Sequence, residues 1–156
     1  MKISKNGINL IKSFEGCRLE AYKPTKNDVW TIGYGHTDNV KKGDVISQLN
    51  AEVLLQNDLQ KFECAINVNV LPKCELTQNE FDALVSFVYN IGIGNFTSST
   101  MLKLLIAQKK KEAASQFDRW IYQGKTVLPG LVKRRQEEKE LFLRPTNFQQ
   151  MRDYLD

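Results

Sequence analysis

The stretch that decides the fold reads Glu15-Gly-Cys-Arg-Leu-Glu-Ala-Tyr22, and after a short interval it is followed by Asp28-Val-Trp-Thr-Ile-Gly-Tyr-Gly-His36. Apolar and β-favouring residues on both sides of a turn-rich centre, which begins at Pro24, are typical of a β-hairpin. Gly16 favours the end of a helix that precedes this hairpin. Glu15 is therefore expected at a helix end, directly before a small sheet.

Helical patterns surround the hairpin. Ser4 is expected to cap a first helix that ends near Glu15, and Asn50 is expected to cap a long amphipathic helix that stops before Pro72. The side chains that predict the buried face of the long helix are Val53, Leu54, Leu59, Phe62 and Ile66.

Downstream of residue 75 the chain is predicted to be mostly helical. Thr77 and Glu80 form a capping box before a helix that is apolar on more than one side, which indicates a buried central helix. We expect 90–95 and 124–130 to be connections between helices. A helical stripe that includes Trp120 is expected to pack in the core.

These patterns predict a fold class that is α+β and mostly helical. The 156 residues suit a single domain, 1–156, and 42% hydrophobic with 26% charged residues exclude a disordered chain. We expect a small β-hairpin lobe at about 15–50 and a larger helical lobe at about 75–156, which also takes the N-terminal helix. A linking helix at about 50–70 is expected to join the two lobes.

Composition narrows the chemistry. A net charge of +4 favours an anionic partner, but no nucleic-acid-binding motif is present. Three cysteines without close spacing exclude a disulfide framework and a Cys-rich metal site, so we expect no metal and no cofactor. The only histidine is His36, so hydrolytic chemistry is expected to fall to carboxylates. No apolar run approaches the ~20 residues of a membrane span, and no stable membrane insertion is expected.

Several motifs together point to a family. Beyond the stretches 15–22 and 28–36, they are Leu54-Leu-x-x-Asp58-Leu, Asn90-Ile-Gly-Ile-Gly-Asn-Phe96 and Gly130-Leu-Val-Lys-Arg-Arg135. With these motifs the chain resembles, over nearly its whole length, the phage-type lysozymes, the endolysins of glycoside hydrolase family 24. The resemblance implies a lysozyme-like, two-lobed fold. It also implies a muramidase that hydrolyses the β-1,4 bond between N-acetylmuramic acid and N-acetylglucosamine in bacterial peptidoglycan, for host cell lysis.

The family resemblance and the chemistry agree on Glu15. Cleavage of a glycosidic bond needs a carboxylic acid that keeps its proton near neutrality and donates it to the leaving oxygen. Thr31 matches the water-positioning threonine of the family, and a hydroxyl can both donate and accept hydrogen bonds. We therefore expect Glu15 and Thr31 to be catalytic.

The second carboxylate is harder to assign, because Pro24 occupies the position where the family commonly has an aspartate. Asp28 is a candidate if the lengthened hairpin displaces it toward the site, and Glu20 is a weaker one. The alternative is that Asp28 closes the turn, for which aspartate is a preferred residue. We favour a catalytic or electrostatic role for Asp28, since no other acidic residue lies between Tyr22 and Thr31.

His36 is expected to be structural rather than catalytic. The resemblance suggests Asp58, in the linking helix, as its partner. A pair of this kind is predicted to tether the two lobes.

Three residues are expected to bind substrate: Tyr89, Asn90 and Arg135. Amides and guanidinium groups bind acetamido and hydroxyl groups, while aromatic rings cover the apolar faces of sugars. Asn90 also matches a groove position of the family. The basic run 133–135 otherwise reads as a solvated face that can steer the protein toward anionic wall polymer.

Two other functions are open. A lytic transglycosylase cuts the same bond with a single acidic residue, and Pro24 is consistent with it. A cell-wall-binding module would keep the groove and lack turnover. By family resemblance we expect a monomer that accumulates in the host cytoplasm and depends on a holin-like protein for release to the cell wall in the periplasm.

Overall fold

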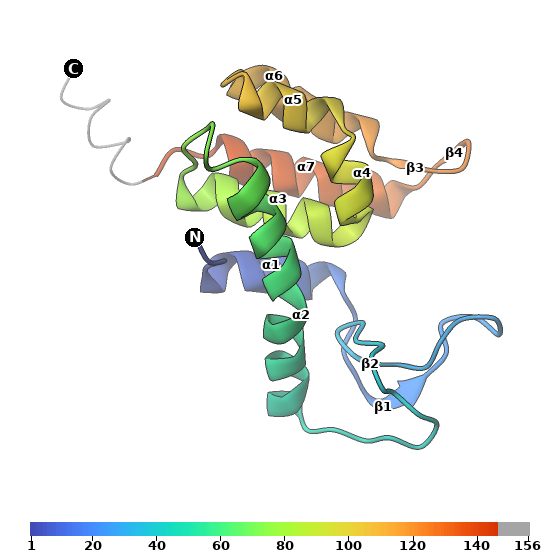
Figure 1. Cartoon of the computed structure of the whole chain (residues 1–156). Coiled ribbons are helices and arrows are strands. Elements are labelled where there is room, and N and C mark those ends of the chain that lie inside the picture. Colours follow the sequence, from blue (N-terminus) through green and yellow to red (C-terminus); the bar gives the residue numbers. More distant parts are fainter. Residues whose placement is uncertain (147–156) are drawn as a thin grey trace. The chain divides into compact units, whose positions relative to one another are not determined.

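The computed structural model describes residues 1–146, which divide into two compact units. The hairpin unit comprises Ile8–Lys61, and the helical unit comprises Met1–Gly7 and the chain from Phe62 onward. In chain order (Figure 1), the elements are α1 Lys5–Phe14, β1 Arg18–Tyr22, β2 Thr31–Gly33, α2 Gln48–Asn69, α3 Gln78–Ile91, α4 Ile93–Thr97, α5 Thr100–Ile106, α6 Lys110–Ser115, the 3-10 helix η1 Gln116–Arg119, β3 Tyr122–Gln123, β4 Thr126–Val127 and α7 Pro129–Leu143.

The predicted fold class is confirmed: the chain is α+β and mostly helical. The boundaries between the two units fall inside helices, after Gly7 in α1 and after Lys61 in α2. Among residues 1–146, no helix is both long enough and apolar enough to cross a bilayer.

The hairpin unit contains the expected two-stranded sheet. β1 and β2 pair antiparallel, with Tyr22 opposite Thr31 and Arg18 opposite Gly33, and a bulge interrupts the register between these pairs. Because β2 starts only at Thr31, residues 24–30 form the turn rather than a strand. Thr31 is therefore the first residue that the sheet holds in place after the turn.

The long helix α2 differs from its prediction at its start and on its buried face. Ser47, not Asn50, is the cap, because the Ser47 hydroxyl accepts a hydrogen bond from the Asn50 N–H at 3.1 Å. Serine caps a helix as well as asparagine does, so the helix begins three residues earlier, at Gln48. Val53 is 46% exposed. The buried side chains instead repeat at four-residue and three-residue steps: Ala51, Leu55, Leu59, Phe62 and Ile66.

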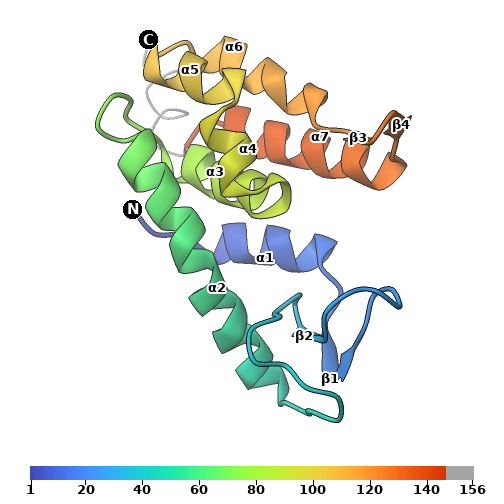
Figure 2. The same cartoon turned by 45° about the vertical axis from the view of Figure 1, so that its right-hand side comes forward.

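The helical unit is built around α3. The predicted capping box is present: the Thr77 hydroxyl accepts from the Glu80 N–H, and the Glu80 carboxylate accepts from the Thr77 N–H. Every residue of 81–88 is buried, as expected for a central helix. Helix α7 packs alongside α3 in both views (Figures 1 and 2). Aromatic residues fill much of the remaining core: Phe81, Phe87, Phe96, Phe117 and Phe142.

The first seven residues belong to the helical unit, and Asp82 holds them there. The backbone N–H and the hydroxyl of Ser4 both donate to the buried carboxylate of Asp82. Ser4 is also the predicted cap of α1, because its hydroxyl accepts from the Gly7 N–H. A Cβ at Gly7 would lie 2.7 Å from Cγ of Asp82, so only glycine fits this close approach.

Three predictions for the helical unit were wrong. Segment 90–95 is not a loop: α3 continues to Ile91 and α4 begins at Ile93, because the chain turns at the single residue Gly92, whose φ is +92°. The connection 124–130 contains half of the hairpin β3–β4, and α7 begins at Pro129, a residue favoured at the first helical position. Trp120 follows η1 instead of lying in a helical stripe. A terminal turn predicted for 146–149 falls, beyond its first residue, outside the described residues.

Candidate active site

Glu15 directly follows the last turn of α1. Its backbone N–H donates to the Ile11 carbonyl at 3.0 Å, which ties it to the helix end as predicted. The residue is half-buried, so its carboxyl group has both protein and solvent neighbours. The helix end and the strand that starts three residues later hold this carboxyl group on a fixed backbone.

Thr31 is 6% exposed at the start of β2. Its hydroxyl donates to the Val29 carbonyl at 3.1 Å, which uses the single hydrogen of the group. The lone pairs of the oxygen are then able to accept a hydrogen bond from a water molecule. The local backbone therefore orients the hydroxyl as an acceptor.

Asp28 lies in the turn. Its backbone N–H donates to the Thr25 carbonyl at 3.1 Å, and its carboxylate accepts from the Thr25 hydroxyl at 2.8 Å. The residue is exposed. These two bonds are the ones by which aspartate stabilises a turn. They support the turn-closing interpretation of Asp28 over the catalytic one.

His36 and Asp58 form the expected pair. Nδ1 of His36 lies 2.8 Å from Oδ2 and 3.0 Å from Oδ1 of Asp58, and Nε2 lies 3.0 Å from the Asp38 carbonyl. All three residues belong to the hairpin unit, so the pair fixes the end of the β-hairpin to α2 inside one unit, and the prediction that it tethers two lobes was wrong.

A second ion pair of the hairpin unit joins α1 to α2. Nζ of Lys12 lies 2.6 Å from Oε1 of Glu52 and also 5.5 Å from the centre of the Tyr34 ring. The hydrogen bond between the two partners lowers the pKa of Glu52 and raises the pKa of Lys12. Sequence reasoning did not single out this pair, because nothing local marks two residues 40 positions apart.

The helical unit holds a buried cluster of charges that the sequence interpretation missed. Arg134, Arg135 and Glu138 are 4%, 1% and 0% exposed, so the prediction of a solvated basic run at 133–135 was wrong for two of its three members. The cause is that this face of α7 packs against α3. The only signal in the sequence was Glu138, which follows the two arginines at helical spacing.

Glu138 connects the two arginines. Its carboxylate accepts from the Ser86 hydroxyl at 2.6 Å, from Nε of Arg134 at 3.3 Å and from Nη1 of Arg135. Burial raises the pKa of Glu138, against the opposite effect of the arginines, and burial lowers the pKa of Arg135. The Glu138 carboxylate and the Arg135 guanidinium group therefore each stabilise the charged form of the other.

The three residues expected to bind substrate differ in their surroundings. Asn90 is exposed, whereas Arg135 is almost completely buried. Tyr89 is half-buried and packs edge to face with Phe62, with ring centres 5.2 Å apart. Asn90 lines a cavity of the helical unit.

That cavity, here called the Asn90 pocket, has a volume of about 600 Å³. It combines apolar side chains with amides and one guanidinium group, a mixture suited to sugars and peptides. Its lining residues are Asn90, Ile91, Asn95, Arg119, Trp120, Tyr122, Gln123, Leu128 and Leu131. Trp120 therefore lines a surface cavity as well as packing on Phe87, whereas the sequence favoured the core over a groove for this residue.

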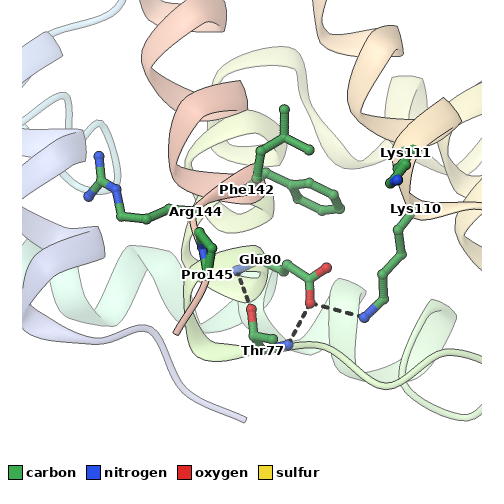
Figure 3. Close-up of a pocket in the computed structure, with 8 residues that line it drawn as sticks. Thr77, Glu80, Lys110, Lys111, Phe142, Arg144 and Pro145 are labelled. Carbon is green, nitrogen blue, oxygen red and sulfur yellow. Dashed lines mark hydrogen bonds and ion pairs between the residues drawn. The ribbon is translucent and has the colours of Figure 1, made fainter. Parts of the chain in front are cut away.

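A second cavity of about 310 Å³ lies where α6, the end of α7 and the start of α3 meet. Three of its polar residues are engaged with each other: Glu80 accepts from the Thr77 N–H at 2.8 Å and from Nζ of Lys110 at 3.0 Å (Figure 3). The carboxylate in this cavity therefore already has a structural role, as part of the cap of α3. Within residues 1–146, no three His, Cys, Asp or Glu side chains gather in a way that could hold a metal ion.

Comparison with known proteins identifies the family. A profile of the phage lysozyme family matches residues 12–138. An endolysin of Bacillus phage B103 is 51% identical over 92% of this chain and 54% of its own length, and an endolysin of Acyrthosiphon pisum secondary endosymbiont phage 1 is 45% identical over 91% and 98%. The chain thus spans about half the length of the first of these relatives.

A solved structure gives the same result. The muramidase domain of SpmX from Asticaccaulis excentricus superposes with a TM-score of 0.85 at 43% identity, over 92% of this chain and 99% of that one. The chain therefore belongs to the phage lysozyme family.

Proposed function

We propose that this protein is an endolysin that hydrolyses the β-1,4 bond between N-acetylmuramic acid and N-acetylglucosamine in bacterial peptidoglycan. The observation that carries the proposal is the half-buried Glu15 at the end of α1, in the same unit as the buried hydroxyl of Thr31. The names of the relatives, endolysin and muramidase, agree with it.

In this proposal Glu15 is the general acid. Its carboxyl group gives a proton to the glycosidic oxygen as the bond to the anomeric carbon breaks. Water adds to that carbon and releases one proton to the solvent, from which Glu15 regains its own proton. Thr31 accepts a hydrogen bond from the attacking water, because its own hydrogen is already donated to the Val29 carbonyl. Asn90 binds a polar group of the glycan.

The test is the mass of the products from soluble, uncrosslinked peptidoglycan strands. Hydrolysis gives a reducing end at N-acetylmuramic acid, and this is the result that we expect. A reducing end at N-acetylglucosamine would contradict the proposed bond. An absence of any product from purified, folded protein would instead support a wall-binding module.

A lytic transglycosylase is the second candidate, and one observation favours it. The carboxylate of Asp28 is engaged in the turn and residue 24 is proline, so neither residue offers a free carboxylate at the position where the family commonly has one. A transglycosylase needs only one acidic group. Its product is a 1,6-anhydro sugar that is one water lighter, so the same mass measurement decides between the two reactions.

The biological setting is proposed on family resemblance. The protein is made in the host cytoplasm, acts as a monomer, and reaches the cell wall in the periplasm with the help of a holin-like protein. Expression in a bacterial host with and without such a protein tests the dependence. Lysis is expected only in the presence of both, and equal lysis without the second protein would contradict it.

A further inference from the structure

Arg135 makes contacts on two sides of the Asn90 pocket although it does not itself line that pocket. From α7, Nη2 donates to Oδ1 of Asn90 at the end of α3, and Nε donates to the Trp120 carbonyl at 3.0 Å. Asn90 and Trp120 both line the cavity, whereas Arg135 is 1% exposed. One buried side chain therefore fixes two wall residues that are 30 positions apart in the sequence.

The bond to Asn90 determines which way its amide faces. A guanidinium group has donors and no acceptor, so Asn90 can meet Arg135 only with its oxygen. The amide nitrogen, which carries two hydrogens, then projects from the opposite side of the amide group. Since Asn90 is exposed and lines the cavity, its amide nitrogen is available as a donor to a ligand there.

The same guanidinium group supports the Trp120 side of the cavity through packing. Its carbon Cζ lies 5.1 Å from the centre of the Phe87 ring. That ring in turn packs edge to face with Trp120, with centres 6.0 Å apart. Both the backbone and the ring of Trp120 are thus held by groups in contact with Arg135.

Glu138 keeps Arg135 in this position. Nη1 of Arg135 donates to Glu138, so the guanidinium group is fixed at one nitrogen by an ion pair and offers its two other nitrogens to Asn90 and Trp120. Lysine could keep the ion pair, but its single ammonium group cannot reach three separate acceptors in this planar arrangement.

We infer that Arg135 is a positioning residue: it orients the Asn90 amide so that its N–H groups donate to an oxygen of the glycan, an acetamido carbonyl or a hydroxyl, and it holds Trp120 beside that amide. This inference rests on the proposed function for its substrate class. It replaces the expectation that Arg135 contacts the substrate directly.

A double-mutant cycle between Arg135 and Asn90 tests the inference. Initial rates on soluble, uncrosslinked peptidoglycan strands give kcat and KM for the wild type, Arg135→Lys, Asn90→Ala and the double variant. Each single variant is expected to raise KM about three- to tenfold with little change in kcat, the loss expected for one hydrogen bond. The double variant should raise KM no more than about twofold beyond Asn90→Ala, because Arg135 acts through Asn90.

Lys139→Met is the matched control. Lys139 is on the same helix and pairs with Asp118 of η1 at 2.8 Å, at the surface, so its loss should leave KM unchanged. If the effects of Arg135→Lys and Asn90→Ala on KM multiply, or if Arg135→Lys lowers only kcat, Arg135 is merely structural and the inference is wrong. A wild-type KM for Asn90→Ala also overturns it.

Asn90→Asp provides a second test that does not depend on the stability of the Arg135 variant. Aspartate keeps an acceptor for Arg135 but replaces the outward amide nitrogen with an oxygen that cannot donate. We expect KM to rise at least threefold with no loss of thermal stability, and an unchanged KM overturns the inference. Failure of the proposed function is recognised separately, because the product mass of the wild type reports the bond that is cut.

Discussion

The two units differ in how many polar and charged side chains they bury. Among the described residues, eight polar or charged side chains are buried; Thr31 is in the hairpin unit, and the other seven are in the helical unit. The hairpin unit has its chemical groups at a helix end and in a turn, while five of its large apolar residues are exposed: Leu19, Val29, Val45, Leu49 and Val53. Substitution of a buried polar or charged residue is therefore expected to reduce stability mainly in the helical unit.

Glu15→Gln is expected to have the largest effect on activity. Glutamine keeps the shape of the side chain but cannot transfer a proton, so the lysis rate should fall by a factor of about 10²–10⁴ or more. Turbidity of a peptidoglycan suspension measures the rate, and thermal melting measures stability. A variant with the wild-type rate would show that Glu15 is not catalytic. It would also contradict the placement of the catalytic acid in the hairpin unit.

Glu138→Gln is expected to have the largest effect on stability. Without the carboxylate, two buried guanidinium groups lose the charge of Glu138, which costs about 3–5 kcal/mol of unfolding free energy. Urea unfolding measures it. Glu140→Gln, on the exposed side of the same helix, is the control and should change the unfolding free energy by less than about 0.5 kcal/mol. Equal effects from both variants would contradict the claim that the buried Glu138 carboxylate stabilises the helical unit.

His36→Asn is expected to have an intermediate effect on stability. The variant loses the bond to Asp58, whose side chain is 23% exposed, and a hydrogen bond to a charged group of this kind contributes about 1–2 kcal/mol. The unfolding free energy should fall by that amount, while kcat of the folded protein stays within about twofold. A large fall in kcat without a loss of stability would make His36 a catalytic residue.

Asp28→Asn distinguishes a turn-closing role of Asp28 from a catalytic role within the hairpin unit. Asparagine can still accept the Thr25 hydroxyl, so the turn is preserved and activity should stay within about twofold of wild type. Thr31→Ala, measured alongside, should lower kcat much more, because the hydroxyl is lost. A loss of a hundredfold or more for Asp28→Asn would restore the catalytic role that the sequence favoured.

Glu52→Gln should have the smallest effect, and the size of that effect depends on pH. Lys12 lowers the pKa of Glu52 below its ordinary value of 4.5, so the pair contributes stability above that pH and loses it as pH falls through the lowered pKa. The melting temperature of the variant should therefore lie below that of the wild type near neutrality, and the difference should shrink in acid. A constant difference between pH 3 and pH 7 would contradict this linkage.

Local signals in the sequence predicted the elements that are stabilised locally. The capping box of Thr77 and Glu80, the Ser4 cap and the β-hairpin with its turn are all stabilised by residues within a few positions of each other. The pairing of His36 with Asp58 was predicted only through the family resemblance.

The features that sequence reasoning missed depend on distant partners. The burial of Arg134 and Arg135 requires Ser86, about 50 positions away, and the cavity beside Asn90 requires Trp120 and the β3–β4 hairpin. A basic run has the same local pattern on a solvated face and in a core. The β-branched Thr126 and Val127 beside Gly124 were a hairpin signal that the composition of the connection concealed.

The hydrogen bonds between Ser4 and Asp82 also set the order in which parts of the protein can fold during synthesis. Ser4 emerges from the ribosome 78 residues before Asp82, a delay of about 4–16 s at the usual rates of elongation. The hairpin unit is one continuous segment, Ile8–Lys61, so all of its residues have been made before Asp82, the partner of Ser4 in the helical unit, is added to the chain. Residues 1–7 are thus made before the hairpin unit, but Ser4 can reach its place in the helical unit only after Asp82 has been made.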